Sequence, residues 1–130
     1  MVLLDRYEEH YIQSNATARE ALKILDKLPD NEIRALLVLE GNKMIGTLTD
    51  GDIRRGLLSN REISESVSLY MNQKFKSIKR EDLRPEVLKK FKEAEIWFLP
   101  VLNENNEIEQ VALRSTLIQA GVMLSKLTNK

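Results

Sequence analysis

Met44-Ile-Gly-Thr-Leu-Thr-Asp-Gly-Asp-Ile-Arg-Arg55 is the stretch around which this chain is organised, because an apolar run changes there into a polar corner. The apolar run ends at Leu48, and Ile53 and Leu57 follow at helical spacing, which predicts a strand that leads directly into a helix. Such a corner brings together unpaired backbone N–H groups, a helix dipole end and short polar side chains. It can therefore hold an anion or the hydroxyl groups of a ribose.

The composition of the chain indicates a globular protein and narrows the choice of partners. A hydrophobic fraction of 42% in 130 residues supports one compact unit, or two small halves that share a core. Twenty basic and twenty acidic residues cancel, which argues against a nucleic-acid partner. The opening Met1-Val-Leu-Leu-Asp5 is too short and too soon acidic for a signal peptide, and no apolar run approaches the ~18 residues of a membrane span. We therefore expect a cytoplasmic protein with no membrane partner.

The scarcity of cysteine and histidine excludes several kinds of site. Without cysteine, neither a disulfide framework nor a cysteine metal site can form, and the single histidine, His10, cannot make a multi-histidine metal site. Nothing indicates a nucleophile–histidine–acid arrangement, so we expect neither catalytic residues nor a metal. We expect His10 at the surface or at its boundary, and Trp97 at a domain seam or an interface.

The first half of the chain has clear signals for its helices and strands. Thr17-Ala-Arg-Glu20 fits a capping box and predicts a helix that runs to about residue 28. The apolar runs 35–39 and 44–49 predict two strands joined by a turn at 40–42, and a second helix is expected at 50–58. Residues 12–15 are expected to form a short extended piece.

The second half repeats the first. Residues 77–89 align with 11–23, and the strand predicted at 98–102 matches 35–39. A turn one residue longer follows, then a strand at 108–113 and a final helix at 114 to about 126. The alternative is a coincidental α+β pattern. The predicted organisation is a first repeat at 1–60, a connecting segment at 61–76 and a second repeat at 77–130.

Two motifs carry a resemblance to a known family. Gly46-Thr-Leu-Thr49-Asp-Gly-Asp52 matches Gly-hydrophobic-hydrophobic-Thr-x-x-Asp, and Leu99-Pro-Val-Leu102 matches the Pro-Val strand of a second copy. Over nearly its whole length, the chain resembles a tandem pair of cystathionine-β-synthase (CBS) domains, a Bateman module. The resemblance implies an α+β fold with two β-α-β-β-α repeats, whose small three-stranded sheets pack face to face with the helices outside. It also implies a homodimer formed through the helices.

A finer likeness concerns what is attached to the module. The stretch 49–56, together with 66–72, resembles CBS pairs that precede sugar-phosphate nucleotidyltransferase domains. The resemblance implies a regulatory segment of a longer protein, cut near Lys130, with a covalently attached catalytic domain. The fragment itself is not expected to be an enzyme.

The resemblance also implies a nucleotide site at the first corner, with AMP, ADP or ATP as regulatory ligand. It places Asp52 on the ribose hydroxyls and Thr49 on the phosphate, and the N–H groups of residues 50–53 would face the phosphate. An entry loop, the start of a strand and at most one of two arginines would complete the pocket. The candidate residues are Thr49, Asp52, Asp50, Gly51, Ile53, Ser14, Asn15, Ala16, Ala35, Leu36, Arg54 and Arg55.

Alternatives remain at each of these positions. Asp50 or Asp52 can simply cap the helix, and Thr49 can simply end a strand. The second corner departs from the motif, because Gln110, Leu113 and Thr116 stand where the glycine, threonine and aspartate are needed. We therefore expect at most one well-formed site per chain. Two functions are predicted, a sensor of an adenosine-type nucleotide and, as the alternative, a ligand-free dimerisation scaffold.

Overall fold

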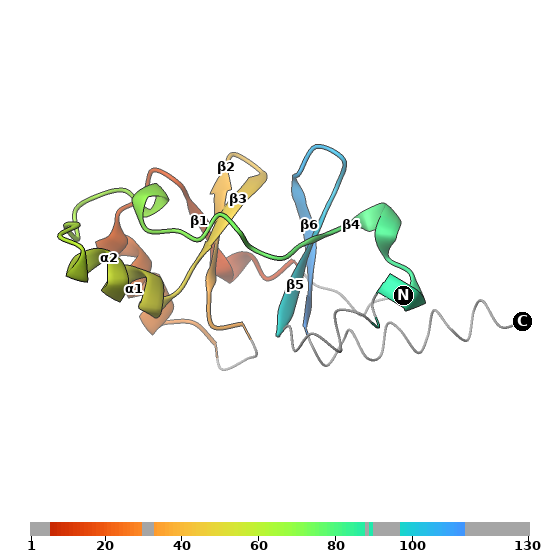
Figure 1. The fold of residues 1–130 in the computed structure, drawn as a ribbon, viewed down its shortest axis with the longest axis horizontal. Coiled ribbons are helices and arrows are strands. Elements are labelled where there is room, and N and C mark those ends of the chain that lie inside the picture. Colours follow the sequence, from red (N-terminus) through yellow and green to blue (C-terminus); the bar gives the residue numbers. More distant parts are fainter. Residues whose placement is uncertain (1–5, 30–32, 88, 90–96, 114–130) are drawn as a thin grey trace, which may run out of the picture. The chain divides into compact units, whose positions relative to one another are not determined.

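The computed structural model describes residues 6–29, 33–87, 89 and 97–113, and these divide into two units. One unit is Tyr7–Phe75, and the other contains the described residues that follow it. The elements in chain order are η1 (Glu8–His10), β1 (Tyr11–Gln13), α1 (Ala18–Asp26), β2 (Leu36–Glu40), β3 (Lys43–Leu48), α2 (Asp50–Leu58), η2 (Val67–Leu69), β4 (Ile78–Lys79), η3 (Arg80–Asp82), β5 (Phe98–Leu102) and β6 (Ile108–Leu113) (Figure 1). The helix predicted at 114–126 lies outside the described residues.

Helix α1 begins where its sequence signal predicts. The backbone N–H of Glu20 donates to Thr17 Oγ1 over 3.2 Å, and the Thr17 N–H donates to Glu20 Oε2 over 3.1 Å. This reciprocal pair is the predicted capping box, and it satisfies N–H groups that the first helical turn leaves without a partner.

The two units contain three-stranded sheets of the same design, which confirms the predicted α+β class. Their orders are β1-β2-β3 and β4-β5-β6, and in each the first pair is parallel and the second antiparallel. Ile12 pairs with Val38 and Val38 with Gly46, just as Ile78 pairs with Val101 and Val101 with Gln110. The register shifts after Val38 and after Val101. This agreement of strand order and register between the two sheets is what the predicted repeat requires. The face-to-face packing of the sheets stays a prediction.

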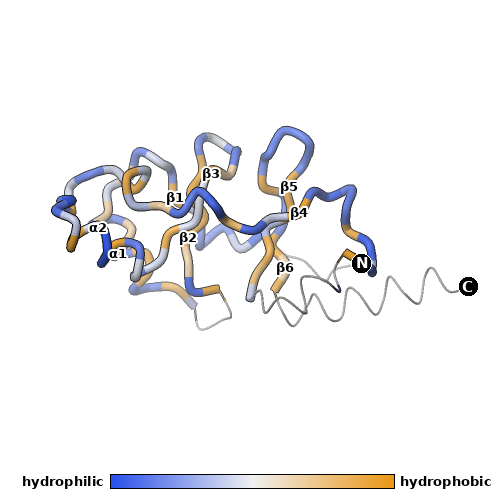
Figure 2. The backbone as a smooth tube through the Cα atoms, viewed as in Figure 1, coloured by the Kyte–Doolittle hydropathy of each residue, from blue (hydrophilic) through white to orange (hydrophobic). Residues whose placement is uncertain are grey.

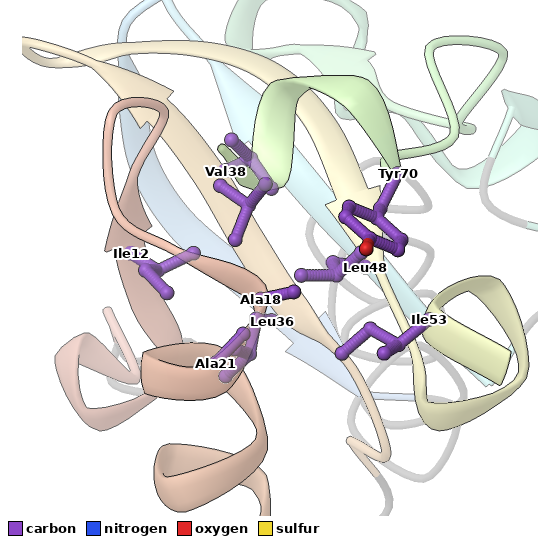
Figure 3. Packing of buried hydrophobic residues seen from close by; sticks show 9 residues of the cluster. Ile12, Ala18, Ala21, Leu36, Val38, Leu48, Ile53 and Tyr70 are labelled. Carbon is purple, nitrogen blue, oxygen red and sulfur yellow. The ribbon is translucent and has the colours of Figure 1, made fainter. Parts of the chain in front are cut away.

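The core of the first unit lies between one face of its sheet and the two helices (Figure 3). Strand β2 is buried over its first four residues, as its continuous apolar run predicts. Figure 2 shows the hydrophobic strands separated by largely hydrophilic turns in both units. None of the helices in the described part of the chain has the length and hydrophobicity that a membrane crossing demands. The buried cluster contains Ile12, Ala18, Ala21, Leu36, Val38, Leu48, Ile53, Val67 and Tyr70.

Residues 61–72, which we call the strap, are hydrogen-bonded along the first unit. The Val67 N–H donates to the Ala16 carbonyl over 2.8 Å. Farther along, Thr47 and Asn72 exchange backbone hydrogen bonds of 3.0 and 2.8 Å, which adds a bridge at the open edge of β3. Most of the predicted connecting segment therefore packs with the first unit, and the repeat boundaries at 60 and 77 stay a prediction.

The prediction that His10 lies at the surface or its boundary is wrong. The side chain is fully buried, and its Nδ1 lies 3.0 Å from the carbonyl oxygen of Ala35. The short helix η1 ends at His10, immediately before β1, and the Tyr7 ring lies edge-on 6.3 Å away. A buried imidazole is tolerated here because a backbone group satisfies its ring nitrogen.

Candidate functional site

The polar corner predicted from the sequence lies between β3 and α2. Thr49 is the N-cap residue of α2, and its Oγ1 accepts a 3.1 Å hydrogen bond from the Asp52 N–H. In return the Thr49 N–H donates to Asp52 Oδ2 over 2.9 Å. The Thr-x-x-Asp spacing thus forms a capping box, with aspartate in the place that glutamate has in α1. Asp52 therefore takes part in capping the helix.

Arg55 covers this first turn of α2. Its Nη2 lies 2.9 Å from Asp52 Oδ1, so both oxygens of that carboxylate have a partner. A Cβ atom placed on Gly51 would lie 3.1 Å from Arg55 Nη1, which shows that the guanidinium folds back over Gly51. The Arg55 side chain is 63% exposed and that of Asp52 is 16% exposed. Arg54 is exposed, and nothing in the described structure directs it to the same place.

The backbone donors of the corner are fewer than expected. The Asp52 N–H is used by Thr49 Oγ1, and the Ile53 N–H donates to the Thr49 carbonyl over 3.2 Å. The expectation that all N–H groups of residues 50–53 face a phosphate is therefore wrong. The N–H groups of Asp50 and Gly51 remain, because the first residues of a helix have no intrahelical acceptor. The Ile53 side chain is 1% exposed and belongs to the core.

The start of β2 lies beside this corner. Leu36 pairs with Leu48, the residue before Thr49, so Ala35 and Leu36 are close to the capped end of α2. Both side chains are buried, and the Ala35 carbonyl is the partner of His10 Nδ1. Of the predicted site residues outside α2, Ala35 and Leu36 are the two that the strand register places near Thr49.

The predicted entry loop lies elsewhere. Because β1 is parallel to β2, residues 14–16 follow the end of β1 beside Leu39, whereas Thr49 follows the antiparallel β3 at the Leu36 end. The Ser14 N–H donates to the Leu39 carbonyl over 2.8 Å, and Ser66 Oγ donates to the Ser14 carbonyl over 2.5 Å. Ser14, Asn15 and Ala16 therefore sit at the opposite end of the sheet from the capping box.

A hollow of about 570 Å³ lies beside α1 and the start of α2. Arg19, Lys23, Asp26 and Asp50 give it two charges of each sign, above apolar side chains that include Leu22, Leu25 and Ile63. Among the described residues around it, Asp50 is the one predicted site residue. Within the described ranges, no group of three histidine, aspartate or glutamate side chains could hold a metal ion.

The packing of the strap beside the corner was not predicted from the sequence. A Cβ atom on Gly46 would lie 2.7 Å from Met71 Sδ, and one on Gly56 would lie 2.3 Å from the Tyr70 ring. The Tyr70 hydroxyl donates to the Glu62 carbonyl over 2.5 Å. Burial, and then the negative charge of Glu65, raises the pKa of this phenol. Gly46 and Gly56 both lie opposite large residues of the strap, Met71 and Tyr70. Two glycines that face one segment were the sequence signal for this packing.

Part of the chain matches a known protein family. Residues 6–59 match the CBS domain family. A CBS domain protein from Streptococcus pneumoniae TIGR4 has a similar structure, with a TM-score of 0.73 and 16% identity over 94% of this chain and 85% of that one. The structure of CBSX2 in complex with AMP gives a TM-score of 0.67 at 15% identity, and the match covers 95% of both chains. These likenesses show the fold.

Two curated relatives are longer proteins. An uncharacterised protein of Helicobacter pylori (strain ATCC 700392 / 26695) is 33% identical over 89 residues, which are 68% of this chain and 27% of the relative. The arabinose 5-phosphate isomerase KdsD of Francisella tularensis is 31% identical over 102 residues, 75% of this chain and 30% of the relative. The chain thus spans under a third of the length of these relatives. Residues 6–59 thus match the CBS domain family, and the observed fold is similar to that of a CBS domain protein.

Proposed function

We propose that this chain is a tandem CBS module whose first repeat senses an adenosine-type nucleotide, such as AMP, ADP or ATP. The observation that carries the proposal is the capped start of α2. There one carboxylate, one hydroxyl group and the N–H groups of Asp50 and Gly51 meet at the positive end of a helix. The similarity to a CBS structure that contains AMP supports the choice of ligand.

The groups of the capping box retain capacity for a ligand. A carboxylate offers about four lone-pair sites, so Asp52 can keep its bond to the Thr49 N–H and accept hydrogen bonds from two ribose hydroxyls. The Thr49 hydroxyl accepts from the Asp52 N–H, and its own hydrogen is free to bond a phosphate oxygen. Asp50 is exposed and can point away from the phosphate, which avoids repulsion between the two anions.

The remaining candidates have unequal roles in this proposal. Ala35 and Leu36 lie beside the corner, where a base can contact their backbone. Residues 14–16 lie at the other end of the sheet, so they reach only an extended ligand. In the second repeat, Leu113 ends β6 with a buried apolar side chain, which supports a structural role for that half.

We infer that the module regulates a catalytic domain in a longer chain. The motif at 49–56 with 66–72 favours a sugar-phosphate nucleotidyltransferase. The relative in Francisella tularensis favours a second candidate, a sugar-phosphate isomerase. Both act on phosphorylated sugars. A ligand changes such an enzyme only to the extent that it binds one state of the module better than another.

The alternative is a dimerisation scaffold that binds no ligand. The proposed contact is the apolar final helix, with Leu117, Ile118, Val122, Leu124 and Leu127, which lies outside the described residues. Light scattering at several protein concentrations tests the homodimer independently of any ligand. A monomer at every concentration would remove the scaffold in this form.

Calorimetric titration of the chain with AMP, ADP, ATP, guanine nucleotides and sugar nucleotides tests the sensor. Asp52→Asn is the sharpest variant, because the amide oxygen still accepts the capping hydrogen bond while the charge is lost. Glu20→Gln makes the same change in the capping box of α1 and serves as the control. We expect Asp52→Asn to weaken AMP binding about tenfold or more, and Glu20→Gln to leave it unchanged. An absence of heat with every nucleotide would refute the sensor.

A further inference from the structure

We propose that Arg55 makes the site at the start of α2 selective for phosphorylated ligands, because its guanidinium competes with the ribose for Asp52 and moves onto the phosphate. This inference rests on the proposed nucleotide site. Arg55 would then be the residue that lets the site distinguish a nucleotide from the corresponding nucleoside.

The Arg55 guanidinium already lies over the first turn of α2. Arg55 follows Gly51 by four residues and Asp52 by three, so all three lie on one side of the helix. The Arg55 Nη2 to Asp52 Oδ1 distance is 2.9 Å, and both Nη atoms approach the space that a Cβ atom on Gly51 would occupy. Because Gly51 has no side chain, the guanidinium can settle over the first turn.

Arg55 and a ribose would compete for the Asp52 carboxylate. Asp52 Oδ2 faces the Thr49 N–H, and Asp52 Oδ1 faces Arg55. Ribose hydroxyls that approach Oδ1 from the side of the guanidinium displace the arginine. The pair is largely exposed on the arginine side, so this displacement weakens binding only modestly, about two- to fivefold. A nucleoside offers the displaced guanidinium no new anion.

The displaced guanidinium would have a new anion close by. A phosphate held by the N–H groups of Asp50 and Gly51 would lie near the Arg55 side chain that already covers Gly51. Guanidinium groups bind phosphate through two parallel hydrogen bonds, which are among the strongest in proteins. The phosphate of a nucleotide therefore gives Arg55 a new partner in place of the Asp52 carboxylate that the ribose has taken. Arg54 lies on another face of the helix and does not contribute.

Calorimetry with AMP and adenosine tests the inference on the 130-residue chain, its Arg55→Gln variant and a matched control. The control is Arg61→Gln, which removes an equally charged side chain from another exposed ion pair, 3.5 Å from Glu65. We expect Arg55→Gln to weaken AMP binding about tenfold and to tighten adenosine binding about two- to fivefold. Arg61→Gln should change neither, and Arg55→Lys should recover part of the AMP affinity because the charge remains.

The outcomes separate this inference from the proposed function. If the unaltered chain binds AMP and Arg55→Gln leaves the ratio of the two affinities unchanged, the selectivity of Arg55 is overturned while the sensor stands. Weaker AMP binding with unchanged adenosine binding would overturn the competition at Asp52. If the unaltered chain binds neither ligand, the proposed function fails and this inference fails with it.

Discussion

The two sheets share one design, but the corners after their third strands differ. In the first repeat, Gly46 in β3 pairs with Val38, and in the second, Gln110 in β6 pairs with the equivalent Val101. Gly46 is buried beneath Met71 and Asn72 of the strap, whereas Gln110 is half-buried. Three residues later, Thr49 caps α2, while Leu113 ends β6 as a buried apolar side chain. The sheet is therefore repeated, and the chemistry of the corner is not.

The strand register and the polar groups of the corner thus depend on different residues. Apolar side chains set the register, and they are present in both repeats. The capping box needs a side-chain oxygen before the helix, which Thr49 has and leucine lacks. Exchanging residues between the two corners is the most direct way to test the comparison.

The largest effect is expected from Gly46→Gln, which gives the first repeat the residue of the second. Its Cβ atom would lie 2.7 Å from Met71 Sδ and 3.1 Å from the backbone oxygen of Asn72. Because a backbone atom cannot move without shifting the strap, we expect the free energy of unfolding to fall by about 1–3 kcal/mol. Urea denaturation followed by circular dichroism measures this loss.

The reverse exchange, Gln110→Gly, is the control for Gly46→Gln. It removes a half-buried strand side chain and should cost no more than about 0.5–1 kcal/mol. The fluorescence of Trp97 reports on the second unit, and the tyrosines Tyr7, Tyr11 and Tyr70 all belong to the first. Equal losses from both exchanges would contradict the role of the strap at Gly46.

The next largest effect is expected from Thr49→Ala. This change removes the acceptor of the Asp52 N–H, so the free energy of unfolding should fall by about 0.5–2 kcal/mol. Thr49→Ser keeps the hydroxyl oxygen and should retain most of the stability. Thermal denaturation followed by far-ultraviolet circular dichroism compares the variants. A serine variant as unstable as the alanine variant would show that the cap contributes little.

A smaller effect, which depends on pH, is expected from Tyr70→Phe. Loss of the hydrogen bond to the Glu62 carbonyl should lower the free energy of unfolding by about 0.5–1.5 kcal/mol at neutral pH. Burial raises the pKa of Tyr70 above its ordinary 10.0, so the unfolded phenol ionises first as the pH rises. The parent chain therefore loses stability above about pH 10, and its advantage over the variant should narrow. A constant difference in urea denaturation from about pH 8 to about pH 11 would contradict this linkage.

The smallest effect is expected from Gly51→Ala. Alanine favours the helix by up to about 1 kcal/mol, and the neighbour that its Cβ meets is the flexible end of Arg55, at 3.1 Å. We expect unchanged or slightly higher thermal stability. Gly56→Ala is the matched control, because its Cβ would lie 2.3 Å from the buried Tyr70 ring and should lower stability. If Gly51→Ala destabilised the chain as much, Arg55 would be fixed over the helix rather than free to move.

The local elements could be predicted from the sequence, because their signals depend on neighbouring residues. The capping box at Thr17 and Glu20 is confirmed, as are the strand at 98–102 and the helix that begins after Thr49. The strand predicted at 35–39 is observed one residue later, at Leu36–Glu40. The asymmetry of the two corners was also visible, since Leu113 stands where the first repeat has threonine. Periodicity and caps act within a few residues, so one sequence is sufficient to find them.

The groups that meet at the corner depend on contacts between distant segments, which the sequence did not predict. The parallel register of β1 carried residues 14–16 to the far end of the sheet, and the same packing buried His10 against Ala35. The strap closed over Gly46, and Arg55 turned back onto Asp52. Contacts between segments many residues apart depend on register and on side-chain rotamers, which the pattern of a single sequence does not encode.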